Sequence, residues 1–100
     1  MFYSYILLSP QFHKFYFGSA KDLKVRVELH NSGKVKSTKP YIPWQLAWYG
    51  GFGTEQEARA FEQYLKSGSG KAFAYKRLIA GALAKDFKKG RISSPKSRKP

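Results

Sequence analysis

The chain has no cysteine, only two histidines and only six acidic residues among its 100 positions. Without cysteine it can form neither a disulfide framework nor a cysteine-ligated zinc site, and it has no thiol nucleophile. Two histidines are too few for a histidine-rich metal site. The six carboxylates are scattered along the sequence, so no cluster of three or four exists to hold two metal ions.

Long apolar runs are also absent. No stretch approaches the ~18 residues of a membrane span, and the N-terminus lacks the basic region of a signal peptide. We therefore expect a cytoplasmic protein with no membrane partner. Apolar residues make up 42% of the chain and aromatic residues 17%, which is enough for one folded domain with a modest core.

Positive charge is what the chain has in excess. Nineteen lysines and arginines face the six acids, giving a net charge of +13. Such a field attracts polyanions, and neutralising phosphates with release of counterions supplies affinity without sequence specificity. No basic amphipathic helix with a strong apolar face favours a lipid surface instead. Nucleic acid is therefore the expected partner.

Hydrophobic patterning predicts three strands, over residues 2–8, 15–18 and 44–49, the last closed by Gly50-Gly51. Helices are expected over residues 23–31, 54–66 and 71–87, with residues 67–70 as a break. Asp22 and Thr54 are suited to cap the first two helices. The order ββαβαα predicts an α+β domain over residues 1–88, and residues 89–100 are expected to be a disordered basic tail.

The first predicted helix carries polar residues on its core-facing stripe. Leu23 and Val27 suit a core, but Arg26 and His30 fall on the same stripe, one turn apart. Arg26 could simply extend its charged end to solvent, with His30 as a hydrogen-bonded histidine at the edge of the core. Alternatively, both side chains reach a scissile phosphate, Arg26 as a charge clamp and His30 in proton transfer.

Glu62 raises the same question on the second helix, because it falls on the inward stripe defined by Ala58, Phe61 and Leu65. A buried carboxylate costs several kcal/mol unless it is paired or binds a metal. Lys66, one turn later, could pair with it. Otherwise Glu62 faces a cavity as a single carboxylate, which suits a hard cation such as Mg²⁺ that keeps most of its waters.

Two tyrosines are predicted to meet across the first hairpin. Tyr5 on the first strand and Tyr16 on the second lie on faces that can adjoin, and Gly18 leaves room for a close approach. An ordinary aromatic pair between strands explains this arrangement. A phenol that orients or activates water explains it as well.

Taken in order, these residues resemble the GIY-YIG nuclease family. Its two half-motifs correspond to residues 3–5 (Tyr-Ser-Tyr) and 16–18 (Tyr-Phe-Gly), separated by the ten residues 6–15. The segments 18–23 and 30–33, with Arg26 between them, are similar to the family's strand-to-helix segment, and Ala58, Phe61, Glu62 and Lys66 to its metal-binding helix. The resemblance covers about residues 2–78 and implies a three-stranded antiparallel sheet flanked by helices.

The resemblance also implies roles for individual residues. Glu62 would bind a single Mg²⁺ or Mn²⁺ ion, Arg26 would contact the scissile phosphate, and His30 would assist phosphate binding or proton transfer. Tyr16 would activate the water, with Tyr5 in support. Ser19 stands where the family's excision-repair nuclease subunit carries a lysine that favours the deprotonated tyrosine, so Lys21 or Lys24 would have to supply that charge.

These expectations describe a small DNA endonuclease that hydrolyses a phosphodiester bond with one metal ion, in DNA repair or recombination. Its DNA could be branched, flapped or single-stranded. Residues expected to contact the nucleic acid are Ser19, Lys21, Lys24, Lys34, Lys36, Lys39, Lys66, Lys71, Lys76 and Arg77. A non-catalytic nucleic-acid-binding protein with the same fold is the alternative. An RNA-associated basic protein would explain the charge but not the ordered polar residues.

Overall fold

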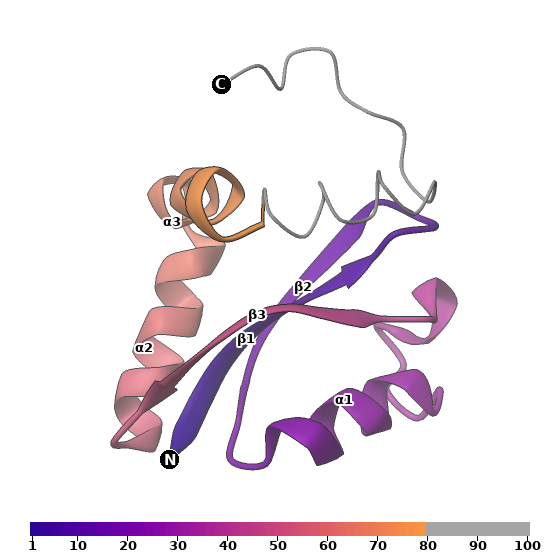
Figure 1. Ribbon diagram of the computed structural model, residues 1–100, viewed down its shortest axis with the longest axis horizontal. Coiled ribbons are helices and arrows are strands. Elements are labelled where there is room, and N and C mark those ends of the chain that lie inside the picture. The colour runs from indigo at the N-terminus through magenta and orange to yellow at the C-terminus, as the bar shows by residue number, and fades with distance from the viewer. Residues whose placement is uncertain (80–100) are drawn as a thin grey trace.

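The computed structural model describes residues 1–79. Its strands form one antiparallel sheet in the order β2-β1-β3, with β1 at Phe2–Ser9, β2 at Lys14–Ala20 and β3 at Gln45–Phe52. Helix α1 (Leu23–Asn31) lies on one side of the sheet, and α2 (Glu55–Lys66) and α3 (Gly68–Phe73) lie on the other (Figure 1). The expected α+β architecture is confirmed. The predicted tail and the end of the predicted last helix lie outside the described residues.

Strand β1 is central and separates two hydrophobic cores. Its side chains alternate between the sheet faces. Tyr5 and Leu7 pack with Trp44 on the α1 side, whereas Ile6 packs with Leu65 on the α2 side. All residues of β1 from position 4 to position 9 are buried. The sequence prediction of a buried first strand is thus confirmed, and the strand holds Tyr5 rigidly between neighbours on both sides.

Helix α1 has the predicted bounds because its ends are marked locally. The Asp22 carboxylate accepts a hydrogen bond from the Val25 amide at 3.1 Å, and Gly33 follows the helix with a φ of 83°. The Asn31 side chain donates to the Trp44 carbonyl at 3.0 Å and accepts from the Trp44 amide at 2.6 Å. These bonds fasten the end of α1 to the start of β3 and so fix the helix against the sheet.

The prediction that Gly50-Gly51 closes the third strand was wrong. The strand continues to Phe52, with Gly50 opposite Ser4 and Gly51 opposite Tyr3. A Cβ on Gly50 would lie 2.7 Å from the Trp48 ring, and one on Gly51 would lie 2.7 Å from a Met1 sulfur. The glycines therefore make room for neighbouring side chains rather than forming a turn.

The predicted break at residues 67–70 was also too long. Helix α3 begins at Gly68, three residues before the predicted start, because the Ser67 hydroxyl accepts a hydrogen bond from the Gly70 amide at 3.1 Å. Gly70 is buried against the last turn of α2, where a Cβ would collide with the Tyr64 carbonyl. A π-helical segment, Ala74–Ile79, continues the chain and contributes Ile79 to the core.

We expect Gly70→Ala to lower the free energy of unfolding by about 3 kcal/mol, the upper range for overpacking, because the obstructing atoms are backbone. Gly68→Ala is the matched control: a Cβ there has nothing within 4 Å. It should change stability by no more than about 1 kcal/mol. Urea unfolding of both variants tests this, and equal stabilities would contradict the close contact between α2 and α3.

Candidate active site at the β2 edge

A polar pocket of about 320 Å³ opens at the edge of β2. It is lined by Tyr5, Tyr16, Gly18, Ser19, Arg26, Arg59, Glu62 and Gln63. These residues come from β1, β2, α1 and α2, so the pocket spans both sides of the edge strand. Four of the five predicted catalytic residues line it: Tyr5, Tyr16, Arg26 and Glu62. The fifth, His30, lies behind Tyr5 and is not part of the wall.

The two tyrosines are diagonal neighbours. Tyr5 pairs directly with Gly18 across the strands, and Tyr16 pairs with Leu7. The Tyr5 and Tyr16 ring centroids are 6.3 Å apart. A Cβ on Gly18 would lie 2.5 Å from the Tyr5 hydroxyl, so glycine at this position lets the phenol lie over the β2 backbone. Tyr5 is fully buried, whereas Tyr16 is partly exposed at the pocket.

His30 is only 1% exposed, and both of its ring nitrogens have partners. Nε2 lies 3.0 Å from the Tyr5 hydroxyl, and Nδ1 lies 2.9 Å from the Thr38 hydroxyl. Thr38 donates its own proton to the Val35 carbonyl, so His30 Nδ1 must donate to Thr38. His30 Nε2 is then the acceptor of the Tyr5 proton, and the hydrogen bonds from Tyr5 through His30 to Thr38 all run in one direction.

Burial, with a further contribution from Tyr16, raises the pKa of Tyr5 to about 12. Burial and the neighbouring Arg26 charge lower the pKa of His30. Both shifts favour neutral groups and agree with a Tyr5 hydroxyl that donates to an uncharged imidazole. At pH 8 only about one Tyr5 in 10⁴ would be deprotonated. Tyr5 is therefore a neutral phenol that lines the pocket, with His30 hydrogen-bonded to it from behind.

The lowered pKa of His30 predicts that acid destabilises the fold. The unfolded chain binds a proton at this residue near pH 6.5, whereas the folded chain resists it. The stabilising contribution is complete above pH 6.5 and is lost as pH falls through the lower folded-state pKa. Urea unfolding at pH 7.5 and pH 5.5 should show this slope, and His30→Gln should reduce it. His13→Asn, at an exposed position, should keep the slope; an unchanged slope in His30→Gln would contradict the assignment.

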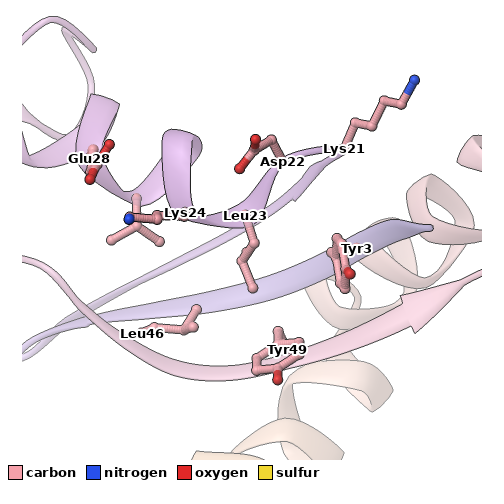
Figure 2. Close-up of a pocket in the computed structure, with 9 residues that line it drawn as sticks. Tyr3, Lys21, Asp22, Leu23, Lys24, Glu28, Leu46 and Tyr49 are labelled. Carbon is pink, nitrogen blue, oxygen red and sulfur yellow. The ribbon is translucent and has the colours of Figure 1, made fainter.

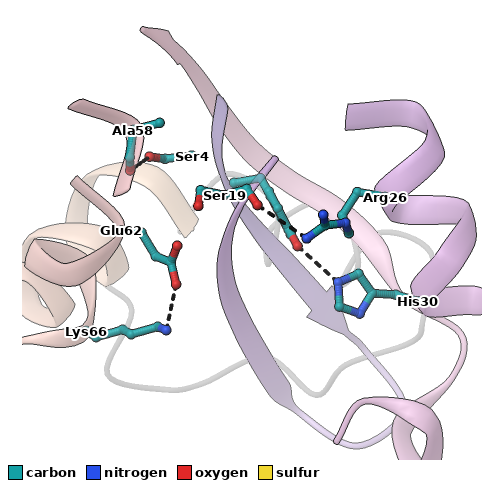
Figure 3. Close-up of polar contacts among 8 residues, drawn as sticks. Ser4, Ser19, Arg26, His30, Ala58, Glu62 and Lys66 are labelled. Carbon is teal, nitrogen blue, oxygen red and sulfur yellow. Dashed lines mark hydrogen bonds and ion pairs between the residues drawn. The ribbon is translucent and has the colours of Figure 1, made fainter. Parts of the chain in front are cut away.

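Arg26 lies between the pocket and the β2 backbone. Its guanidinium donates to the Ser19 carbonyl at 3.3 Å, and its side chain is partly exposed. Figure 3 shows Arg26 on the α1 side of β2 and Glu62 on the α2 side. Arg26 also lines an adjoining polar pocket of about 530 Å³ together with Lys21 and Arg59. A guanidinium at the wall of a polar pocket is suited to bind a phosphate.

The sequence left two alternatives for Glu62, pairing with Lys66 or facing a cavity, and the structure shows both. Its carboxylate pairs with Lys66 at 2.7 Å, and it also lines the pocket with only 15% of its side chain exposed. The Lys66 side chain is 45% exposed, so water can solvate its ammonium in place of the carboxylate. Lys66 can therefore release the carboxylate to a stronger partner such as a divalent cation.

The donor set suits one hard metal ion. Within residues 1–79, no group of three or more His, Cys, Asp or Glu side chains could hold a metal. Glu62 offers one carboxylate, so an ion bound there would keep water and substrate oxygens as its other ligands. Mg²⁺ and Mn²⁺ accept such sites, whereas structural zinc requires four protein ligands.

The sequence reasoning missed Arg59 and Gln63. Arg59 lies one turn before Glu62 on α2 and lines the pocket beside Ser19. Its guanidinium pairs with Glu55 at 2.8 Å, with both side chains largely exposed. The three-residue spacing from Glu62 could have placed it on the same helix face. Arg26 and Arg59, rather than Lys21 or Lys24, are the cations that share this pocket with Tyr16 and Ser19.

The remaining basic residues lie outside the pocket but on the surface. Lys21, Lys24 and Lys66 are exposed. The other predicted contacts are exposed as well: Lys34, Lys36, Lys39, Lys71, Lys76 and Arg77. Their contact with nucleic acid stays a prediction. No helix within residues 1–79 is long and apolar enough to cross a membrane.

Comparison with known proteins agrees with this geometry. Residues 1–76 match the family described as the GIY-YIG catalytic domain. A curated protein of *Streptococcus pneumoniae* serotype 4, called UPF0213 protein, is 38% identical over 53 residues, which cover 52% of this chain. The aligned part spans about half, 54%, of that relative's length. No solved structure matches. Because the family match covers three quarters of the chain, the protein belongs to the GIY-YIG family, a family of nucleases.

Proposed function

We propose that this protein is a metal-dependent DNA endonuclease that hydrolyses phosphodiester bonds at the β2-edge pocket. The observation that carries the proposal is the convergence of Tyr16, Arg26 and Glu62 in one polar pocket. An acceptor of protons, a phosphate-binding cation and a metal-binding carboxylate are the groups that phosphodiester hydrolysis needs. The family membership supports nuclease activity and DNA as the substrate.

Arg26 and Glu62 hold the substrate in this proposal. Arg26 binds the scissile phosphate and stabilises the negative charge that develops on its oxygens. Glu62 would hold one Mg²⁺ or Mn²⁺ ion after Lys66 releases it. When bound, such an ion polarises the phosphate and lowers the pKa of a coordinated water.

Tyr16 is assigned to accept the proton of the attacking water while it is in its phenolate form, because its ring lines the pocket and is partly exposed. Tyr5 is not suited to this role, since its pKa is raised to about 12. Instead Tyr5 presents its oxygen to the pocket while its proton is held by His30. His30 thus supports proton transfer through Tyr5 and makes no contact with the phosphate.

The surface charge supports recognition of DNA shape rather than a long sequence. Exposed lysines at positions 34–39 and basic residues at positions 71–77 offer phosphate contacts, which position a protein on DNA without reading its sequence. Branched, flapped or single-stranded DNA is the proposed substrate. A cytoplasmic location and a role in DNA repair or recombination belong to the same proposal.

The test is an incubation of the protein with branched, single-stranded and duplex DNA in Mg²⁺, Mn²⁺ or EDTA. We expect nicking that requires the metal and favours the non-duplex substrates. A non-catalytic binding protein with the same fold would bind these DNAs without cutting any of them in either metal. That outcome would refute the endonuclease proposal. Stronger binding to RNA than to DNA in competition would favour an RNA-associated protein.

A further inference from the structure

A second, apolar groove of about 710 Å³ lies between the start of α1 and the strands β1 and β3. Figure 2 shows Leu23 of α1 and Tyr3, Leu46 and Tyr49 of the sheet around the same space. The Tyr3 and Tyr49 rings meet edge to face, with centroids 5.9 Å apart. Tyr49 is 54% exposed and Leu46 39%, so this aromatic and aliphatic surface is open to a ligand.

The charges around the groove balance. Lys21 and Lys24 stand against Asp22 and Glu28, and the Asp22 carboxylate already caps α1 through the Val25 amide. A phosphate would gain little from such a rim. A flat, uncharged, aromatic group would instead gain contact with exposed tyrosine and leucine side chains. The groove is also within the size range of about 300–1,000 Å³ that is typical of small-ligand pockets.

The groove is continuous with the candidate active site. Lys21 lines both the groove and the adjoining polar pocket. That polar pocket shares Ser19, Arg26 and Arg59 with the β2-edge pocket. It contains three cations, Lys21, Arg26 and Arg59, against the single carboxylate of Glu55. The cationic polar pocket, which suits phosphates, therefore lies between the β2-edge pocket and the apolar groove, which suits a base.

We propose that this groove binds an unpaired nucleobase of the DNA strand being cut, with the base stacked on Tyr49 and the intervening phosphate beside Lys21 and Arg59. The inference rests on the proposed function and specifies its substrate. A base inside a duplex is stacked and paired and must be flipped out before it can reach the groove, so single-stranded or flapped DNA places a base here at lower cost. The groove would thereby select unpaired DNA next to the scissile bond.

The test measures binding of oligonucleotides that carry 2-aminopurine, in EDTA so that nothing is cut. Wild-type protein should quench 2-aminopurine in single-stranded DNA by stacking. Tyr49→Leu should weaken single-strand affinity by about 5- to 150-fold, the range of one stacked base, and leave duplex affinity unchanged. Tyr49→Phe keeps the ring and should behave like wild type. Tyr64→Leu, at a 42% exposed tyrosine on α2, is the matched control and should also behave like wild type.

Unchanged single-strand affinity in Tyr49→Leu would overturn the inference and leave the groove to another occupant, such as a protein partner. An equal loss for single strands and duplex would overturn it too. Photocross-linking of wild-type protein to a 5-bromodeoxyuridine oligonucleotide gives evidence without any variant: adducts are expected at Tyr3 or Tyr49, and adducts elsewhere alone would contradict it. Binding is measured without metal, so this experiment is independent of cleavage. Base binding in the groove can be absent while nicking that depends on Glu62 persists, and base binding can be present while nicking is absent.

Discussion

Replacing Glu62 with glutamine should reduce metal-dependent cleavage by about 10³-fold, the upper range for loss of one charge-stabilising group. The glutamine keeps the shape of the side chain but removes its negative charge. No cluster of acids within residues 1–79 can take over, because no three of them gather anywhere. The fold should survive, since the pair with Lys66 is partly exposed and contributes little. Single-turnover cleavage in Mg²⁺ and thermal unfolding measure the two effects.

Two controls separate metal binding from the ion pair. Lys66→Met breaks the same pair but leaves the carboxylate in the pocket, so it should weaken DNA affinity while cleavage at saturating DNA remains. Glu57→Gln changes an acid on the same helix that lies outside the pocket and bonds to the Thr54 cap, and it should keep full cleavage. If Lys66→Met lost as much cleavage as Glu62→Gln, the ion pair rather than a metal would explain the role of Glu62.

Replacing Arg26 with alanine should lower the cleavage rate at saturating DNA by about 10²–10³-fold, because a positive charge that meets the scissile phosphate is removed. Arg26→Lys should recover only part of the rate, since lysine lacks the planar fork that binds two phosphate oxygens. Stability should change less, because Arg26 is partly exposed and its hydrogen bond to the Ser19 carbonyl is long, at 3.3 Å.

Arg77→Ala is the control for loss of charge alone. Arg77 is exposed and away from the pocket, so its loss should weaken affinity and reduce the salt dependence of binding, without changing the rate at saturation. An Arg26→Ala variant that behaved in the same way, with a normal rate at saturating DNA, would show that Arg26 only attracts the DNA.

Elements with local signals could be predicted from the sequence. Asp22 and Gly33 mark the ends of α1, and Thr54 caps α2 by accepting from the Glu57 amide at 3.1 Å. Elements decided by distant contacts could not. Gly50 lies inside β3 because the Trp48 ring occupies the space of a side chain. Gly70 lies inside α3 because the helix approaches the end of α2 there. In both cases the missing side chain of glycine leaves space for a neighbouring group. From the sequence alone, the same glycine indicates a turn.

The residues of the candidate site also include some that could be predicted from the sequence and some that could not. The spacing of Tyr5, Tyr16, Arg26 and Glu62 predicted residues that the fold brings to one pocket. The burial of His30 could not be predicted, because it depends on Thr38, eight residues away in the loop, and on the Tyr5 and Tyr16 rings that lie against it. Arg59 was missed because its spacing from Glu62 indicates only a shared helix face and not a place at the pocket. Its place beside Ser19 becomes visible only when α2 packs against β2.

The central claim is that one metal ion, held by Glu62, supports DNA cleavage at this pocket. The most direct test counts Mn²⁺ bound to the protein by electron paramagnetic resonance, with a cleavage-resistant phosphorothioate DNA present, and measures cleavage of ordinary DNA in parallel. We predict one DNA-dependent Mn²⁺ per chain in wild type and in Lys66→Met, with both the ion and the cleavage lost in Glu62→Gln. Cleavage without a divalent cation, or wild-type cleavage by Glu62→Gln, would contradict the account.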